Sequence, residues 1–334
     1  MQSTFKAYRV NEVAPNSYKT QIEELSFDEL PNANDENSVL IKVKYSSLNY
    51  KDALSSTGNK GVSKNFPHTP GIDAAGIVEE SKSDLFKKGE KVIVTGFDLG
   101  MNTAGGFAEY IRVPAHWVVK LPRGMKLKES MIIGTAGLTA AMCIDRMLEN
   151  GLKKENGKVV VTGSTGGVGT LAVMILAKLG FEVVAVTGKP ESTTFLQNIG
   201  ASEIIDREAL NDTSNRPLLK GIYAGAVDTV GGNMLATVLK SMKYNGVVSI
   251  CGLVQSPSLP TSVFPFILRG VSMFGIDSAE ASIEWRKKLW LKLAKAWKPV
   301  GLDGVTKTVT LKGLQKEIDK ILKGKQVGRV LVRL

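Results

Sequence analysis

The sequence is poor in the residues that most often hold metals or cross-link a fold. It has 334 residues but only two histidines and two cysteines. Two cysteines are too few for a disulfide framework, which fits a reducing compartment. Cys143 and Cys251 lie in apolar stretches, so we interpret them as buried, inert thiols. His68 and His116 are far in sequence from both cysteines, so the chain offers no set of about four zinc ligands with a familiar spacing. We expect no metal site.

Other signals are missing as well. There is no Gly-x-Ser-x-Gly elbow and no Ser/His/Asp set, so we expect the chemistry to come from a cofactor's hydride. The first residues form no apolar signal region, and we expect no apolar stretch of membrane-spanning length. These absences favour a cytoplasmic protein without a membrane partner.

The chain is basic, with a formal net charge of +11. Its lysines and arginines are spread along the sequence, without a dense basic run or interleaved aromatic residues. Nucleic acid is therefore not the expected partner. The charge indicates a solvated basic surface or, alternatively, a small phosphorylated ligand such as a nucleotide cofactor or a coenzyme A ester.

The pattern of apolar residues changes twice. The first 125 residues contain short β-like runs, punctuated by turn residues, at 39–45, 74–80, 91–97 and 107–113. From about 129 to 276, six strand-like segments alternate with helix-like ones, which predicts a parallel, doubly wound sheet. The tail predicts a helix at 283–297, with a tryptophan and leucine spacing that favours core packing over a membrane surface. It ends in β-rich segments, which we expect to return to the first module.

The sharpest motif is VVVTGSTGGVGTLAV, residues 159–173. Its glycines follow a predicted strand and begin a predicted helix, the context in which a glycine-rich turn binds phosphate. Without side chains, the backbone can approach a pyrophosphate, and the helix directs its free N–H groups at the anion. The spacing is GxxGxxG rather than the more common GxGxxG. The alternative is a tight turn without a ligand.

The end of the second strand of the doubly wound sheet indicates which nucleotide is bound. NAD sites place an acid there for the ribose 2′-hydroxyl. This chain has Thr187, Gly188 and Lys189 instead, and Arg207 follows the third strand. A hydroxyl and cations attract a 2′-phosphate, whereas a carboxylate repels it. The sequence therefore predicts NADPH as the cofactor, and the alternative is an ordinary turn with surface cations.

Taken together, these motifs resemble those of a known enzyme family. The segments are SSLNYKDAL (46–54), FPHTPGIDAAG (66–76), GGFAEY (105–110), IGTAGLTA (133–140), VTGSTGGVG (161–169), AVTGK (185–189), DTVGG (228–232), PFILRGVSMFGIDS (265–278) and GRVLV (328–332). In this order they resemble the medium-chain dehydrogenase/reductase superfamily over essentially the whole chain. More narrowly, they resemble its zinc-free, quinone-oxidoreductase-like branch and the acrylyl-CoA reductase group within it.

The resemblance implies an α/β fold of two domains. A GroES-like β domain would contain residues 1–124 and about 298–334, and a Rossmann domain with a doubly wound parallel sheet would contain 125–297. It also implies a homodimer, with the apolar stretch 262–275 as the candidate interface. Zinc-dependent members carry a cysteine within the segment that here reads SLNYKD, and Gly-His-Glu where this chain has Gly71, Ile72 and Asp73.

The resemblance also assigns the site residues. Tyr50 would contact the nicotinamide, with Asn49 and Asp52 beside it as the catalytic group. The residues that would bind the cofactor are Tyr50, Thr165, Gly166, Gly167, Val168, Gly169, Thr187, Gly188, Lys189, Arg207, Leu253, Ile267, Ser278 and Arg329. For the apolar positions among them, core packing is an equally good interpretation.

The expected reaction is NADPH-dependent reduction of the activated C=C bond of an α,β-unsaturated acyl-CoA, such as acrylyl-CoA to propionyl-CoA. The alternative is a quinone or enone reductase that uses the same hydride step. A third interpretation is a non-catalytic NADPH-binding protein with a regulatory or RNA-binding role, which a visible basic stripe would favour and the sequence does not show.

Overall fold

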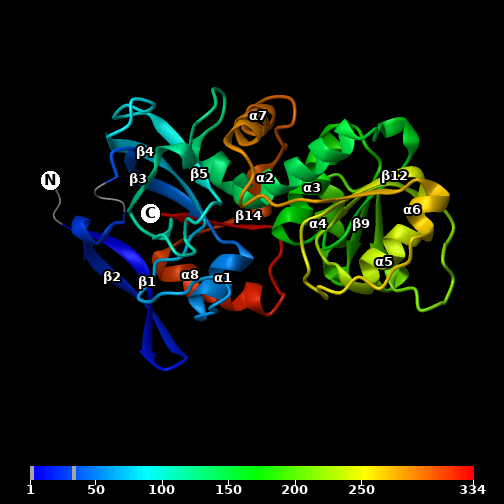
Figure 1. Ribbon diagram of the computed structural model, residues 1–334, viewed down its shortest axis with the longest axis horizontal. Helices are drawn as coiled ribbons and strands as arrows, with labels where there is room; N and C mark the ends of the chain where they lie inside the picture. Colours follow the sequence, from blue (N-terminus) through cyan, green and yellow to red (C-terminus); the bar gives the residue numbers. More distant parts are fainter. Residues whose placement is uncertain (1–3, 32–34) are drawn as a thin grey trace. The chain divides into compact units, whose positions relative to one another are not determined.

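The computed structural model describes residues 4–31 and 35–334 (Figure 1). The chain divides into two compact units. The first unit contains the chain up to Thr135, together with Ala279–Ala294 and Leu302–Leu334, and the second contains Ala136–Ser278 and Lys295–Gly301. These bounds differ from the expected 124 and 298, because the start of the long helix near 127 and the helix at 283–294 both group with the first unit.

The first unit is built around a seven-stranded sheet. Its strands run in the order β14-β15-β3-β4-β5-β7, and β6 also pairs with β3. Along β3, Val39, Ile41 and Val43 enter one buried apolar cluster while Leu40 enters another, as the two-residue period of a strand requires. The strands are β3 (Ser38–Ser47), β4 (Asp73–Ser81), β5 (Lys91–Thr95), β6 (Tyr110–Pro114), β7 (Val118–Lys120), β14 (Thr306–Thr310) and β15 (Arg329–Arg333).

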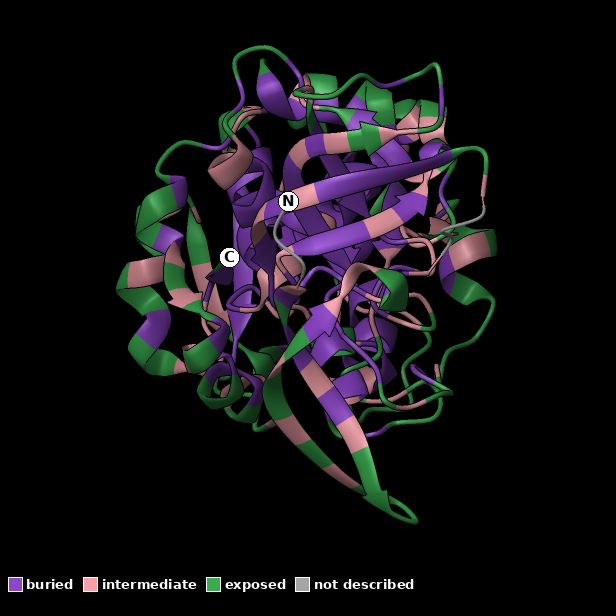
Figure 2. Cartoon of the chain, turned by 90° about the vertical axis from the view of Figure 1, so that its left-hand side faces the viewer, coloured by how far each residue is buried: buried purple, intermediate pink, exposed green. Residues whose placement is uncertain are grey.

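The remaining elements of the first unit surround this sheet. The hairpin formed by β1 (Thr4–Ala14) and β2 (Ser17–Ser26) has an exposed tip, which Figure 2 shows in green. Short α1 (Tyr50–Ser56) packs against α8 (Leu311–Leu322). The unit also contains α7 (Ile283–Ala294) and the 3₁₀ turns η1 (Phe27–Glu29), η2 (Ala115–Trp117) and η6 (Leu302–Val305).

The second unit contains the predicted parallel sheet, with strands in the order β10-β9-β8-β11-β12-β13. All its neighbouring strands are parallel. From β8 the chain adds β9 and β10 on one side of the sheet, and then β11, β12 and β13 on the other side. Ligands of such sheets bind beyond the carboxyl ends of the strands at the point where the order reverses, here between β8 and β11. The strands are β8 (Val159–Val161), β9 (Val183–Thr187), β10 (Glu203–Asp206), β11 (Tyr223–Asp228), β12 (Met242–Ile250) and β13 (Ser272–Gly275).

Helices and turns connect these strands. Figure 1 shows them in green and yellow around the sheet. They are η3 (Lys154–Asn156), α3 (Gly167–Lys178), η4 (Pro190–Ser192), α4 (Thr193–Asn198), η5 (Arg207–Leu210), α5 (Gly232–Lys240) and α6 (Phe264–Arg269).

The long helix α2 (Leu127–Glu149) has a non-helical backbone at Gly134, with φ 51° and ψ −160°, and is therefore kinked. By length and composition it could cross a membrane, which corrects the expectation that no apolar stretch approaches that length. However, 83% of its most apolar window is buried within the protein, as in the core helix of a globular fold.

Candidate cofactor and active site

The glycine-rich turn joins β8 to α3 and has little spare room. Gly163 has a positive φ of 60°, and a Cβ there would lie 2.4 Å from Thr229 Oγ1. A Cβ on Gly169 would lie 2.3 Å from the backbone oxygen of Gly163. Because no real side chain tolerates such distances, Gly169 lets the first turn of α3 pack directly on the loop, and Gly163 lets the loop approach Thr229. The free N–H groups of α3 therefore begin immediately beyond the strand.

Buried hydroxyls hold this turn against the neighbouring strands. The Ser164 hydroxyl donates to the Val161 carbonyl (2.7 Å) and accepts from the Val186 N–H (3.0 Å). On the other side, the Thr162 hydroxyl donates to a carboxylate oxygen of Asp228 (2.7 Å), a residue whose pKa is raised by burial. The loop is thus tied to β9, which carries Thr187, and to the end of β11.

A cavity of about 540 Å³ lies within the second unit, at the carboxyl ends of its strands. It brings together five of the residues predicted to bind the cofactor, which are Thr165, Thr187, Gly188, Lys189 and Arg207. The parallel register pairs Asp206 with Thr187, which places the following Arg207 beside Gly188. A Cβ on Gly188 would lie 2.7 Å from Arg207 Cδ, so the arginine side chain crosses the bare glycine backbone.

The polar groups of this cavity suit an anionic nucleotide. The Thr187 hydroxyl accepts from the Lys189 N–H (3.0 Å), which fixes the turn after β9. Burial lowers the pKa of the half-buried Lys189, and the nearby Glu191 opposes this shift. Arg207 is exposed and lies 3.5 Å from the Glu208 carboxylate. The N–H groups of α3 fit a pyrophosphate, and the two cations fit one further phosphate.

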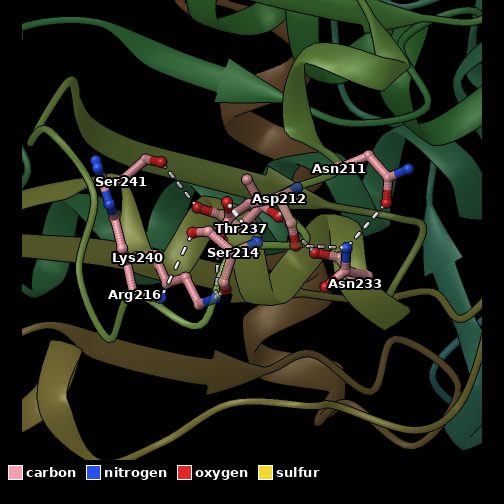
Figure 3. Close-up of polar contacts among 8 residues, drawn as sticks. All are labelled: Asn211, Asp212, Ser214, Arg216, Asn233, Thr237, Lys240 and Ser241. Carbon is pink, nitrogen blue, oxygen red and sulfur yellow. Dashed lines mark hydrogen bonds and ion pairs between the residues drawn. The ribbon is translucent and has the colours of Figure 1, made fainter.

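One wall of the cavity is fastened to α5 by a polar network, shown in Figure 3. Asn233 Nδ2 donates to Asn211 Oδ1 (2.9 Å), and Asn211 lines the cavity. Next to it, Asp212 accepts from Lys240 Nζ (2.9 Å) and its N–H donates to Thr237 Oγ1 (3.0 Å). Hydrogen bonds within this loop and the lysine lower the pKa of Asp212 to about 2, so its carboxylate stays charged.

The second predicted cluster lies in the first unit, at the start of α1. Asn49 caps this helix, and its backbone N–H donates to Asp52 Oδ2 (2.7 Å). The other oxygen of Asp52 accepts from the N–H groups of Gly71 (3.1 Å) and Ile72 (2.8 Å). Asp52 is fully buried, and burial, followed by the charge of Asp73, raises its pKa to about 7. Its contacts make it a support for the loop and not a group open to substrate.

The side chains around Asp52 form a buried polar cluster. Asp73 accepts from Asn49 Nδ2 (2.8 Å), the Ser47 hydroxyl (2.5 Å) and the Thr135 hydroxyl (2.6 Å). Arg329 donates to the Ile132 carbonyl (2.9 Å) and lies 3.3 Å from Asn49 Oδ1. Burial lowers the pKa of Arg329, and Asp73 and Asp52 oppose this shift.

Tyr50 differs from its neighbours because it is open to solvent. It begins α1, and half of its surface (51%) is exposed. Asn49 has an amide already engaged with Asp73 and with the Ser47 carbonyl (3.3 Å). Within the predicted catalytic trio, Tyr50 is therefore the most exposed side chain.

The other predicted residues do not line the cavity. Gly166 caps α3, and Gly167, Val168 and Gly169 form its first turn. Leu253 and Ile267 are exposed (63% and 67%), and Ser278 accepts a hydrogen bond from Thr139 (2.6 Å). The other residues of the lining were not predicted to bind the cofactor, and these are Gly163, Val186, Glu208, Leu210, Asn211, Val230, Met234, Val254 and Gln255. Gly163, Val186 and Val230 lie in the VTGSTGGVG, AVTGK and DTVGG motifs, which are the sequence signals that point to this group.

Two further expectations concern cysteine and metal. Both cysteines are free, but only Cys143 is fully buried, whereas Cys251 is partly exposed, which corrects its assignment as a buried thiol. The Cys251 thiol and burial raise the pKa of Cys143 well above its usual range. Over residues 4–31 and 35–334, no group of three or more His, Cys, Asp and Glu side chains could hold a metal ion.

Comparison with known proteins places these features in a family. Residues 35–123 match the alcohol dehydrogenase GroES-like domain, and 167–296 match the zinc-binding dehydrogenase domain. The chain is 41% identical to "Putative quinone oxidoreductase YhfP" of Bacillus subtilis, and the similarity covers the full length of both proteins. The crystal structure of that relative with NAD bound matches the whole chain with a TM-score of 0.95.

Two other relatives are equally similar. The chain is 42% identical to acrylyl-CoA reductase AcuI of Ruegeria pomeroyi, over 95% of each protein. The crystal structure of the yhdH oxidoreductase from Salmonella enterica in complex with NADP is 40% identical, with a TM-score of 0.94 over 98% of this chain and 99% of that one. The two-domain pattern, the glycine-rich turn and these full-length similarities agree, and the chain belongs to the medium-chain dehydrogenase/reductase family.

Proposed function

We propose that this protein is an NADPH-dependent oxidoreductase that reduces the activated C=C bond of an α,β-unsaturated acyl-CoA, with acrylyl-CoA to propionyl-CoA as the expected reaction. The observation that carries the proposal is the cavity at the carboxyl ends of β8, β9 and β10, which combines a glycine-lined helix start with two cations. The similarity to a protein named acrylyl-CoA reductase supports the choice of substrate.

The nucleotide would bind in two parts. The turn from Thr165 to Gly169 would hold the pyrophosphate, because backbone N–H groups at the start of α3 are free to donate there. Thr187, Gly188, Lys189 and Arg207 would hold the 2′-phosphate, since a hydroxyl and two cations lie in one cavity.

The first unit would contribute the group that handles charge on the substrate. When bound, NADPH supplies a hydride, which the β-carbon of the thioester receives. Negative charge then develops on the thioester oxygen, and the α-carbon must take up a proton. The hydroxyl of the half-exposed Tyr50 would donate a hydrogen bond to that oxygen, and one well-placed donor of this kind contributes about 3 kcal/mol. The same hydroxyl would supply the proton. Water is the alternative source of the proton.

Asn49, Asp52 and Arg329 would position Tyr50 and not touch the substrate. The capping interaction between Asn49 and Asp52 fixes the first turn of α1, which begins with Tyr50. Arg329 lies behind Asn49, within 3.3 Å of its side-chain oxygen. The three residues thus orient the helix that presents the tyrosine.

The second candidate substrate is a quinone or a simple enone, because a relative of equal similarity is named a quinone oxidoreductase. Oxidation of NADPH, followed by its absorbance, separates the two candidates in a panel of acrylyl-CoA, crotonyl-CoA, quinones and enones. Preference for the CoA esters is the expected result. Turnover of quinones alone would favour the second candidate, and no turnover of any acceptor would overturn both.

The apolar stretch at 262–275 supports a homodimer as the working form, and the similarity to bacterial oxidoreductases supports the cytoplasm as its compartment. Val263, Phe264, Ile267 and Leu268 are all exposed there, and the neighbouring β13 is an edge strand of its sheet. Light scattering should give twice the chain mass of 35.9 kDa, and Ile267→Asp should lower it. A monomeric wild-type protein would overturn this assignment.

A further inference from the structure

The cavity that we assign to the nucleotide also contains a carboxylate. Glu208 lines it together with Lys189 and Arg207. One oxygen of Glu208 lies 3.5 Å from Arg207 Nε, and the other accepts from Asn211 Nδ2 at 3.0 Å. The cavity therefore presents two cations and one anion, although the sequence motifs indicated only the cations.

The backbone around Glu208 is held in place from both sides. Asp206 ends β10 and caps the following turn, since its carboxylate accepts from the Glu208 N–H at 2.9 Å. At the other end of the turn, Leu210 is buried and Asn211 is tied to Asn233 (Figure 3). Glu208 is 67% exposed at its side chain, but it extends from a fixed backbone. If the carboxylate turned out of the cavity, it would lose its contacts with Arg207 Nε and Asn211 Nδ2.

We propose that Glu208 is a specificity-determining residue that limits the preference of this pocket for a 2′-phosphate. Its negative charge repels the phosphate, and its ion pair with Arg207 competes with the phosphate for the guanidinium group. The carboxylate can also accept the hydrogen bond that an unphosphorylated 2′-hydroxyl donates. The proposal rests on the proposed use of NADPH and deepens it. The protein should then accept NADH as a weaker but usable cofactor.

Glu208→Gln is the direct test, because it removes the charge and keeps the size and an acceptor for Asn211. Binding is measured by calorimetry with 2′,5′-ADP and with 5′-AMP, which differ by the 2′-phosphate alone. NADPH and NADH are titrated in the same way. Glu182→Gln is the matched control. Glu182 precedes β9 at the far end of that strand, where it pairs with Lys158 at 3.4 Å, and its removal changes the net charge equally.

In low salt, Glu208→Gln should strengthen 2′,5′-ADP binding about three- to tenfold, and the gain should shrink in 0.5 M salt. Binding of 5′-AMP should stay constant or weaken, and the preference for NADPH over NADH should rise. The control should change these ratios by less than about twofold by the same screening argument. If Glu208→Gln leaves the ratios at the wild-type value while the wild-type protein binds NADPH, the role of Glu208 is refuted alone. If the wild-type protein binds neither nucleotide, the proposed function itself fails.

Discussion

A single methyl group at position 169 tests the geometry of the glycine-rich turn. In Gly169→Ala the new Cβ would lie 2.3 Å from the Gly163 oxygen and 2.8 Å from Ser164 Cα. Carbon atoms make ordinary contacts at about 3.5 Å or more, so α3 and the turn must separate by about 1 Å. Both neighbours are backbone atoms, and no side-chain rotation can relieve the clash.

The expected cost follows from two opposing effects. Overpacking costs about 1–3 kcal/mol, and contact with backbone places this variant at the upper end. Alanine inside a helix is favoured over glycine by about 1 kcal/mol, which offsets part of the loss. The net destabilisation is about 2 kcal/mol, which corresponds to a fall in Tm of about 4–8 °C for a unit of this size.

Gly166→Ala is the matched control for this experiment. Gly166 has a negative φ of −75°, and its Cβ would meet only the Gly163 oxygen, at 3.3 Å. Its cost should stay below about 1 kcal/mol, the usual effect of alanine at a helix cap. Calorimetric unfolding of both variants measures the difference. Equal Tm values for the two variants would refute the close approach of α3 to the turn.

Three further predictions concern charge and catalysis. Burial raises the pKa of Asp52 to about 7, whereas the same carboxyl in the unfolded chain loses its proton near pH 4. Between pH 4 and 7 the folded state therefore holds one more proton, and the free energy of unfolding should fall by about 1.4 kcal/mol per pH unit as the pH rises. Urea unfolding at several pH values should show that Asp52→Asn flattens this slope, and an unchanged slope would contradict the assignment. Lys240→Met removes the ion-pair partner of Asp212 in the cavity wall. Calorimetry should show weaker NADPH binding, while kcat at saturating NADPH should stay constant. A lower kcat with unchanged NADPH binding would argue against a role of Lys240 in the cavity wall. Tyr50→Phe should lower kcat by up to about a hundredfold with little change in the Kd for NADPH, and undiminished turnover would remove the hydroxyl from the mechanism.

Much of the second unit could be predicted from the sequence, because its strands are short apolar runs and several of them are followed by a helix pattern. All six strands occur in the parallel sheet that this alternation indicates. The first unit was harder to predict. In the β1–β2 hairpin, β2 buries only Leu25 and has no strong apolar alternation, and α1 has only seven residues.

The residues of the site likewise differ in how far the sequence predicts them. Thr187 ends a recognisable strand and Lys189 follows it, so their place in the cavity could be inferred from sequence alone. Glu208 and Asn211 enter the cavity through the turn after β10 and its anchorage to α5, which no local motif encodes. The buried contacts of Asp52 likewise depend on Gly71 and Ile72, about twenty residues away.

The pairing of β15 with β3 affects the order in which the chain can fold. Tyr45–Ser47 at the end of β3 pair with Leu331–Arg333, nearly three hundred residues later. The sheet strands of the second unit all lie between Val159 and Gly275. During synthesis, the second unit can therefore form while the first sheet still lacks two of its strands. Until β14 and β15 emerge from the ribosome, the end of β3 offers unpaired backbone groups that another chain could bind.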